Sequence, residues 1–221
     1  NTKEVYGMAQ EAHGAFYDLL AVRGVSRRDF LKYCSYVAAM LGLSEAAAPA
    51  IAAAVEKGSK LKPALWLNGG SCSGCTESMA QVDTPDVATI VLDLLSLNYF
   101  ETIMAAAGEQ AEKNFADTVA AGGYLVIYEG AVMTGEDGNT LLVNLHKSTD
   151  ILKEAAEGAD AIIAVGACAV DGGWVYGYPN PAGGIGVQSF LDKEGIKTPV
   201  VNLPCCPTSP EWVVAMVVQW L

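Results

Sequence analysis

The feature that most constrains the fold is a series of short apolar runs that alternate with helical patterns from Lys62 onward. The runs are rich in valine, isoleucine or leucine, which is typical of strands buried on both faces. We predict strands at 64–67, 89–94, 124–128, 161–165 and 200–203, and helices at 105–121, 149–157, 187–194 and 211–220. Strands that alternate with helices need right-handed crossovers, so the pattern predicts an α/β fold with a doubly wound parallel sheet.

Composition and charge narrow the class of protein. The 221 residues are 52% hydrophobic and only 17% charged, which suits one core of buried parallel strands. We assign this domain to 61–221 and treat 1–60 as a separate extension. The formal charge of -12 argues against nucleic acid or anionic lipid as a main partner, because clustered Lys and Arg bind those surfaces. We expect no nucleic-acid partner, and membrane association only through other proteins.

Four cysteines lie in turns that directly follow predicted strands: Cys72 and Cys75 in SCSGC, Cys168 in VGACA and Cys206 in LPCCP. The carboxyl ends of parallel strands meet at one edge of a sheet, so a doubly wound fold could bring these thiols together. Four thiolates suit zinc or an iron–sulfur cluster. One close pair with two distant single cysteines favours iron and sulfur over the two close pairs of a structural zinc site, without excluding zinc.

Other interpretations of these loops stay open. Disulfides between Cys72 and Cys75, or between Cys168 and Cys206, are compatible with the sequence. Glycines and prolines flank the cysteines, at 69, 70, 74, 166, 172, 173, 204 and 207. Such residues let backbone N–H groups approach inorganic sulfides closely, and they also serve ordinary turn formation.

The N-terminal extension contains the sequence SRRDFLK at Ser26–Lys32, followed by an alanine-rich stretch at 33–54. This resembles a twin-arginine export signal, with a small-x-small cleavage site at 50–52. Arg27 and Arg28 could instead be charges at the start of an amphipathic helix capped by Ser26. We expect export by the twin-arginine route to the periplasm or the outer face of the cytoplasmic membrane. That route carries folded, cofactor-loaded proteins, as a buried cluster requires.

The motifs around the cysteines resemble the small subunit of [NiFe] hydrogenases. The matches run in order through 26–221: LWLNG at 65–69, CSGCTES at 72–78, DLLSL at 93–97, MAAAG at 104–108, QAE at 110–112, LVIYEG at 125–130, VGACA at 165–169, PNP at 179–181, NLP at 202–204 and CP at 206–207. The resemblance implies a flavodoxin-like domain. It also implies that Cys72, Cys75, Cys168 and Cys206 ligate a proximal 4Fe-4S cluster.

The resemblance further implies an electron-transfer role. Electrons would pass between a nickel–iron centre in a partner large subunit and an acceptor, such as a cytochrome or another iron–sulfur protein. Hydrogenase activity would belong to the complex, because the paired CxxC motifs that ligate nickel are in the large subunit and this chain has no catalytic metal site. Glu112 matches a family glutamate near the cluster, and its alternative interpretation is a solvated helix charge.

Two departures from the family pattern matter. Cys205 stands where the family usually has glycine, and we expect it to be a bystander thiol rather than an extra ligand. Family members usually continue into a domain that holds a medial and a distal cluster. We expect this chain to hold one cluster only, as a short form or a piece of a longer subunit. His13, His146 and Cys34 lie outside the cysteine motifs and are not expected to be ligands.

Two alternative functions remain. The first is the cluster-bearing quinone-reductase subunit of complex I, which has two adjacent cysteines in the first loop where this chain has CxxC. The second is a non-catalytic metal-binding or redox-sensing module that uses zinc or a disulfide. The sequence GGIG at 183–186 is only a weak nucleotide-loop signal, because it lacks the strand-to-helix glycine pattern.

Overall fold

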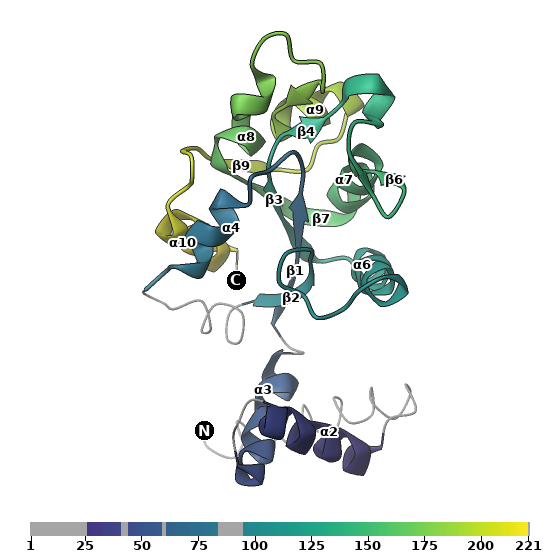
Figure 1. The fold of residues 1–221 in the computed structure, drawn as a ribbon, viewed down its shortest axis with the longest axis vertical. Coiled ribbons are helices and arrows are strands. Elements are labelled where there is room, and N and C mark those ends of the chain that lie inside the picture. Colours follow the sequence, from purple (N-terminus) through teal and green to yellow (C-terminus); the bar gives the residue numbers. More distant parts are fainter. Residues whose placement is uncertain (1–25, 41–43, 59–60, 84–94, 221) are drawn as a thin grey trace. The chain divides into compact units, whose positions relative to one another are not determined.

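The computed structural model describes residues 26–40, 44–58, 61–83 and 95–220. The chain divides into two compact units, Asn1–Leu61 and Lys62–Leu221, which are considered separately (Figure 1). Among the described helices, none combines the length and the apolar character that a membrane span requires.

The first unit contains helices α2 (Arg27–Met40) and α3 (Ala48–Gly58), with a 3-10 turn η1 (Glu45–Ala47) before α3. Ser26 caps α2 reciprocally: the backbone N–H of Asp29 donates to Ser26 Oγ at 3.1 Å, and Ser26 Oγ donates to the Asp29 carboxylate at 2.6 Å. Phe30 and Cys34 of α2 pack against alanines of α3. Burial raises the pKa of the Cys34 thiol.

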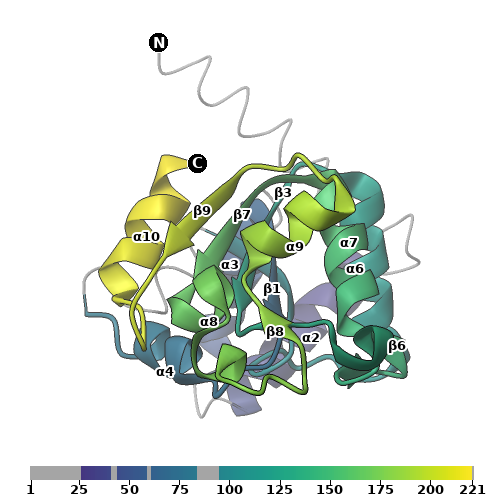
Figure 2. The same cartoon turned by 90° about the horizontal axis from the view of Figure 1, so that it is seen from above.

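The second unit is built on a five-stranded sheet whose strands are all parallel. Its members are β1 (Lys62–Asn68), β2 (Leu95–Phe100), β3 (Tyr124–Glu129), β7 (Ala159–Val165) and β9 (Val200–Leu203). They lie in the order β2-β1-β3-β7-β9, and hence 2-1-3-4-5 when these five strands are counted along the chain. Figure 2 shows β1, β3, β7 and β9 of this sheet. This is the flavodoxin-like order, so the predicted α/β doubly wound fold is confirmed.

One strand of the sheet is missing from the predictions made from the sequence. Four of the five predicted strands coincide with β1, β3, β7 and β9. The strand predicted at 89–94 lies outside the described residues, and the strand beside β1 is β2 at Leu95–Phe100. This strand is at the edge of the sheet, and its middle residues are only partly buried. It therefore lacks the continuous apolar run that reveals a strand buried on both faces.

Helices cover both faces of the sheet. The four predicted helices are present as α6 (Glu109–Ala121), α7 (Ser148–Gly158), α9 (Val187–Glu194) and α10 (Pro210–Gln219), with α6 starting later than expected, after Gly108 at φ 56°. Two short helices, α4 (Gly74–Ala80) and α8 (Gly166–Asp171), were not predicted. The remaining elements are β4 (Val132–Met133), β5 (Leu142–Val143), β6 (His146–Lys147), β8 (Gly184–Ile185), η3 (Gly135–Gly138) and η4 (Gly173–Tyr176).

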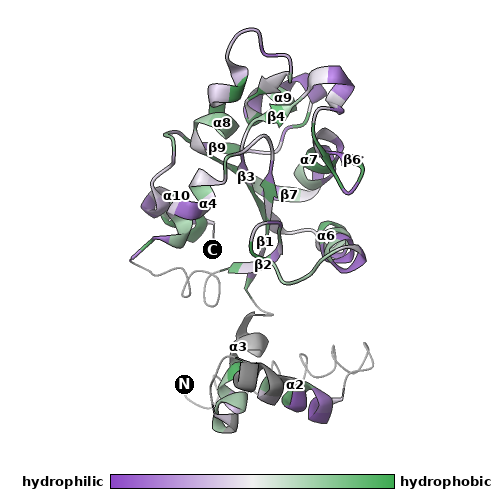
Figure 3. Ribbon diagram, in the orientation of Figure 1, coloured by the Kyte–Doolittle hydropathy of each residue, from purple (hydrophilic) through white to green (hydrophobic). Residues whose placement is uncertain are grey.

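Alternate strand residues pack on opposite sides of the sheet. One core contains Leu65 and Val126 together with side chains of α6, α7 and α9. The other contains Trp66 and Ile127 together with side chains of α4 and α10. The strands carry mostly hydrophobic residues, whereas α6 shows polar ones on its outer side (Figure 3). Both faces of the sheet are thus occupied, and its carboxyl edge is left for a site.

Candidate metal centre

A pocket at the carboxyl edge of the sheet gathers five of the six cysteines. Its walls come from 71–75 after β1, 129–130 at the end of β3, 165–168 after β7 and 205–207 after β9. All six cysteines are free thiols. The predicted meeting of three cysteine loops at one sheet edge is therefore what the structure shows.

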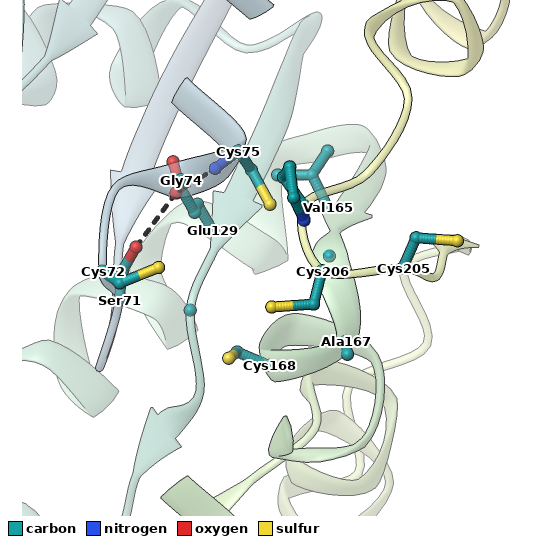
Figure 4. Close-up of a pocket in the computed structure, with 13 residues that line it drawn as sticks. Ser71, Cys72, Gly74, Cys75, Glu129, Val165, Ala167, Cys168, Cys205 and Cys206 are labelled. Atoms are coloured by element: carbon teal, nitrogen blue, oxygen red, sulfur yellow. Dashed lines mark hydrogen bonds between the residues drawn. The ribbon is translucent and has the colours of Figure 1, made fainter. Parts of the chain in front are cut away.

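Four of the five sulfurs face one another across this pocket. Figure 4 shows the sulfurs of Cys72, Cys75, Cys168 and Cys206 directed into the shared space, whereas the Cys205 sulfur points away. The charges of Cys72 and Cys206 raise the pKa of both Cys75 and Cys168, as expected of thiols within electrostatic reach. The four residues brought together are those singled out from the sequence.

The loop after β1 is fixed to the end of β3 by backbone hydrogen bonds. The Gly69 N–H donates to the Glu129 carbonyl at 2.7 Å, and Gly70 and Ala131 exchange two bonds of 2.8 and 3.1 Å. A Cβ on Gly69 would lie 2.4 Å from the Ala131 carbonyl oxygen and 2.4 Å from the Tyr128 hydroxyl. Only glycine fits this approach, which sets where the segment with Cys72 and Cys75 begins.

Glu129 organises the same loop from inside the protein. This carboxylate is the last residue of β3 and only 2% exposed. One oxygen accepts hydrogen bonds from Ser71 Oγ and the Cys75 N–H, both at 3.0 Å. The other accepts from the Thr76 N–H at 3.1 Å, Thr76 Oγ1 at 2.5 Å and Trp66 Nε1 at 3.3 Å. Sequence reasoning missed this role, although a lone acidic residue ending the apolar run YLVIYE was a usable signal.

The loop after β7 needs glycine for contact with sulfur. Gly166 has φ 85°, and a Cβ there would lie 2.5 Å from the Cys75 sulfur. Gly173 has φ 49°, and its Cβ would lie 2.7 Å from the Cys168 sulfur. These two backbone segments lie directly against the thiols because they carry no side chains. That arrangement leaves the space between the four sulfurs clear.

The loop after β9 has an unusual conformation at Cys205. Its φ is 92°, in the left-handed region that glycine favours, and its carbonyl accepts a hydrogen bond from the Ala167 N–H at 2.8 Å. The backbone of Cys205 thus ties the third loop to the second. Its exposed side chain lies outside the group of four sulfurs.

Burial disfavours thiolates in this pocket when no cation is bound. Desolvation, together with smaller effects of the charges of Glu129, Cys72 and Cys206, raises the pKa of Cys75 to about 11, although a backbone hydrogen bond at Thr208 opposes the rise. Desolvation also raises the pKa of Cys168. A bound metal would reverse this preference, because metal coordination deprotonates a thiol.

The remaining candidate residues lie elsewhere. Glu112 is in the first turn of α6 and lines a separate pocket with Tyr99 and His146. Since α6 packs on the sheet face opposite to α4, its position does not bring Glu112 to the cysteine pocket. His146 is exposed in β6, and His13 lies outside the described residues. Within the described segments, no three Cys, His, Asp or Glu side chains converge on a single-ion site.

Comparison with known proteins gives consistent matches. The family described as NADH ubiquinone oxidoreductase, 20 Kd subunit, matches residues 72–220. The chain is 39% identical to the periplasmic [NiFe] hydrogenase small subunit 1 of Nitratidesulfovibrio vulgaris, over 91% of this chain and 63% of that protein. It is also 39% identical to the hydrogenase-1 small chain of Escherichia coli K12, over 91% of this chain and 54% of that protein.

Solved structures agree with these sequence matches. The [NiFeSe] hydrogenase from Desulfovibrio vulgaris Hildenborough matches with a TM-score of 0.69 at 36% identity, over 72% of this chain and 59% of that chain. The Ni-Fe-Se hydrogenase from Desulfomicrobium baculatum matches with a TM-score of 0.70 at 30% identity, over 72% and 61%. The chain spans between 54% and 63% of the length of the two curated relatives above.

The raised pKa of Cys75 predicts slow alkylation of the metal-free protein. A rise from the ordinary 9.0 to about 11 lowers the thiolate fraction at pH 8 about a hundredfold. Iodoacetamide labelling followed by mass spectrometry should show Cys75 reacting last among the pocket cysteines, with exposed Cys205 as the internal reference. The Cys75 rate should rise about tenfold per pH unit from 8 to 10. Equal labelling rates of Cys75 and Cys205 would contradict the described environment.

Proposed function

Since this chain belongs to the NADH ubiquinone oxidoreductase, 20 Kd subunit, family, we propose that it is the small subunit of a [NiFe] hydrogenase and transfers electrons in a hydrogenase complex, as its similarity to hydrogenase small subunits supports. The observation that carries this proposal is the pocket into which the sulfurs of Cys72, Cys75, Cys168 and Cys206 point. These four residues bind one 4Fe-4S cluster. The nickel–iron site belongs to a separate large subunit, and a cytochrome or another iron–sulfur protein accepts the electrons.

The donor set fits an iron–sulfur cluster better than a single metal ion. Iron–sulfur clusters of this type are held by four thiolates, and the four cysteines here line one pocket. Gly166 and Gly173 keep the backbone close to the sulfurs without blocking the space between them. When bound, the cluster supplies reversible one-electron transfer.

This chain's own residues set the conditions for that transfer. Burial of Cys75 excludes water from one side of the site. Cys72 and Cys206 are exposed, which leaves the pocket accessible at the sheet edge, where a partner can approach closely.

The second candidate function, a complex I-like quinone-reductase subunit, is favoured by the family description alone. The CxxC spacing and the curated hydrogenase relatives favour the first.

The cysteine assignment predicts the iron content of the protein. Anaerobic reconstitution of the full chain with iron and sulfide should give about four iron and about four sulfide per chain, because that is the content of one 4Fe-4S cluster. Cys206→Ala should lose at least half of this iron, measured by metal analysis and by paramagnetic resonance after reduction.

Cys205→Ala is the matched control, because it removes the neighbouring thiol whose sulfur points away from the pocket. It should keep the full iron content. A colourless protein with one zinc per chain would overturn the cluster. Loss of iron in Cys205→Ala but not in Cys206→Ala would overturn the ligand assignment.

The subunit role predicts the source of electrons. In a complex copurified with its large subunit, hydrogen gas should reduce the cluster, observed as a paramagnetic signal of the reduced state. The isolated chain should not respond to hydrogen, because no nickel site is proposed in it. Reduction by NADH through a flavin-containing partner without nickel would instead establish the complex I-like function.

We also propose that the chain is exported through the SRRDFLK sequence, consistent with the word periplasmic in the name of the relative from Nitratidesulfovibrio vulgaris. Changing Arg27 and Arg28 together to lysine should reduce the periplasmic fraction at least tenfold, measured by cell fractionation. Lysine keeps both charges, and the Ser26–Asp29 cap is untouched. If Arg27 and Arg28 were only charges at the start of a helix, this change would not alter the periplasmic fraction. An unchanged periplasmic fraction would therefore contradict the export-signal proposal.

A further inference from the structure

We propose that Glu129 is a positioning residue that holds the segment 71–76 in its cluster-binding conformation and lowers the reduction potential of the cluster. The proposal rests on the cluster function argued above and adds a residue that does not ligate the metal. One buried carboxylate thus both holds the CxxC turn in place and adds a negative charge beside the cluster.

The first observation is where this carboxylate lies. Glu129 pairs with Asn68 of β1 and with Val165 of β7, so it occupies the middle of the sheet edge that carries the pocket. It is 2% exposed and lines the pocket. Burying a carboxylate is costly unless hydrogen bonds compensate. A carboxylate charge at this position therefore needs hydrogen-bond donors, and four of its five donors belong to the segment 71–76, the fifth being Trp66 of β1.

The second observation is which groups bind Glu129. Its donors lie on both sides of the CxxC sequence: Ser71 before Cys72, and the backbone of Cys75 and Thr76 at its end. One carboxylate thus holds the two ends of the turn at a fixed separation. Removing it would release both ends at once.

The third observation is that the turn needs such support. Ser73, between the two cysteines, has φ 62°, a left-handed conformation that non-glycine residues rarely adopt. The Ser73 N–H donates to Ser71 Oγ at 2.9 Å, and Ser71 Oγ in turn donates to Glu129. The unfavourable residue is therefore connected to the carboxylate through one serine hydroxyl.

The fourth observation concerns charge. Both carboxylate oxygens of Glu129 accept hydrogen bonds from neutral groups. None of the salt bridges among the described residues includes Glu129. Its negative charge is compensated only by neutral donors. A negative charge beside a cluster disfavours the arrival of an electron, so the reduction potential falls.

The test compares Glu129→Gln with Glu112→Gln in the full chain. Both remove one carboxylate charge, but Glu112 lines a different pocket. In the reconstituted protein, Glu129→Gln should shift the one-electron reduction equilibrium toward the reduced state at least tenfold, which is about 59 mV. Glu112→Gln should shift it less than threefold. Redox titration followed by paramagnetic resonance measures both.

A second measurement uses the metal-free protein. Glutamine keeps one acceptor oxygen and replaces the other by a donor, so the Cys75 or Thr76 N–H loses its partner. Amide hydrogen exchange at 75–76 should become at least tenfold faster in Glu129→Gln and stay unchanged in Glu112→Gln. Equal exchange in both variants, or equal potentials, would overturn the role of Glu129.

If Glu129→Gln does not fold, a second variant with the opposite expected shift of the reduction equilibrium still tests the proposal. Thr76→Val keeps the carboxylate but removes the 2.5 Å donor, so the charge of Glu129 is less compensated. The reduction equilibrium should then shift toward the oxidised state, and a shift toward the reduced state would contradict the proposal. If the wild-type chain binds no iron, the cluster function fails, whereas the exchange measurement still decides the positioning role.

Discussion

The position of every cysteine in the pocket depends on the register of four parallel strands. Asn68 of β1 pairs with Glu129 of β3, Glu129 pairs with Val165 of β7, and Val165 pairs with Leu203 of β9. These four strands therefore end level at one edge. The loops that follow them start from the same line, and their cysteines reach one pocket although they are far apart in the sequence. Close packing on both faces of the sheet holds this register, because a slipped strand would exchange the residues of the two cores.

The pocket at this sheet edge combines closely packed glycine backbone with buried ionisable side chains. Gly69 and Gly166 allow approaches that a Cβ would block, and the left-handed Cys205 joins the last loop to the one after β7. Burial and neighbouring charges raise the pKa of Cys75, so the metal-free pocket favours protonated thiols. A metal group with positive charge removes that conflict. Binding of the proposed cluster would thus be coupled to ordering of the site.

The sequence allowed the sheet and the four ligand candidates to be predicted, because strands buried on both faces are continuous apolar runs and their turns contain cysteine. It did not reveal β2, whose middle residues are only partly buried at the sheet edge. It also directed attention to Glu112, which lines a different pocket from the one that holds the cysteines. The role of Glu129 depends on hydrogen bonds from residues more than 50 positions away along the chain, and only the folded arrangement shows them.

The most direct test of the central claim is anomalous diffraction at the iron edge from crystals of the anaerobically reconstituted protein. The account predicts several iron atoms in the pocket, with bonds to the sulfurs of Cys72, Cys75, Cys168 and Cys206 and none to Cys205. A single zinc ion, a disulfide between any of these four residues, or iron bound by Cys205 in place of Cys206 would contradict it.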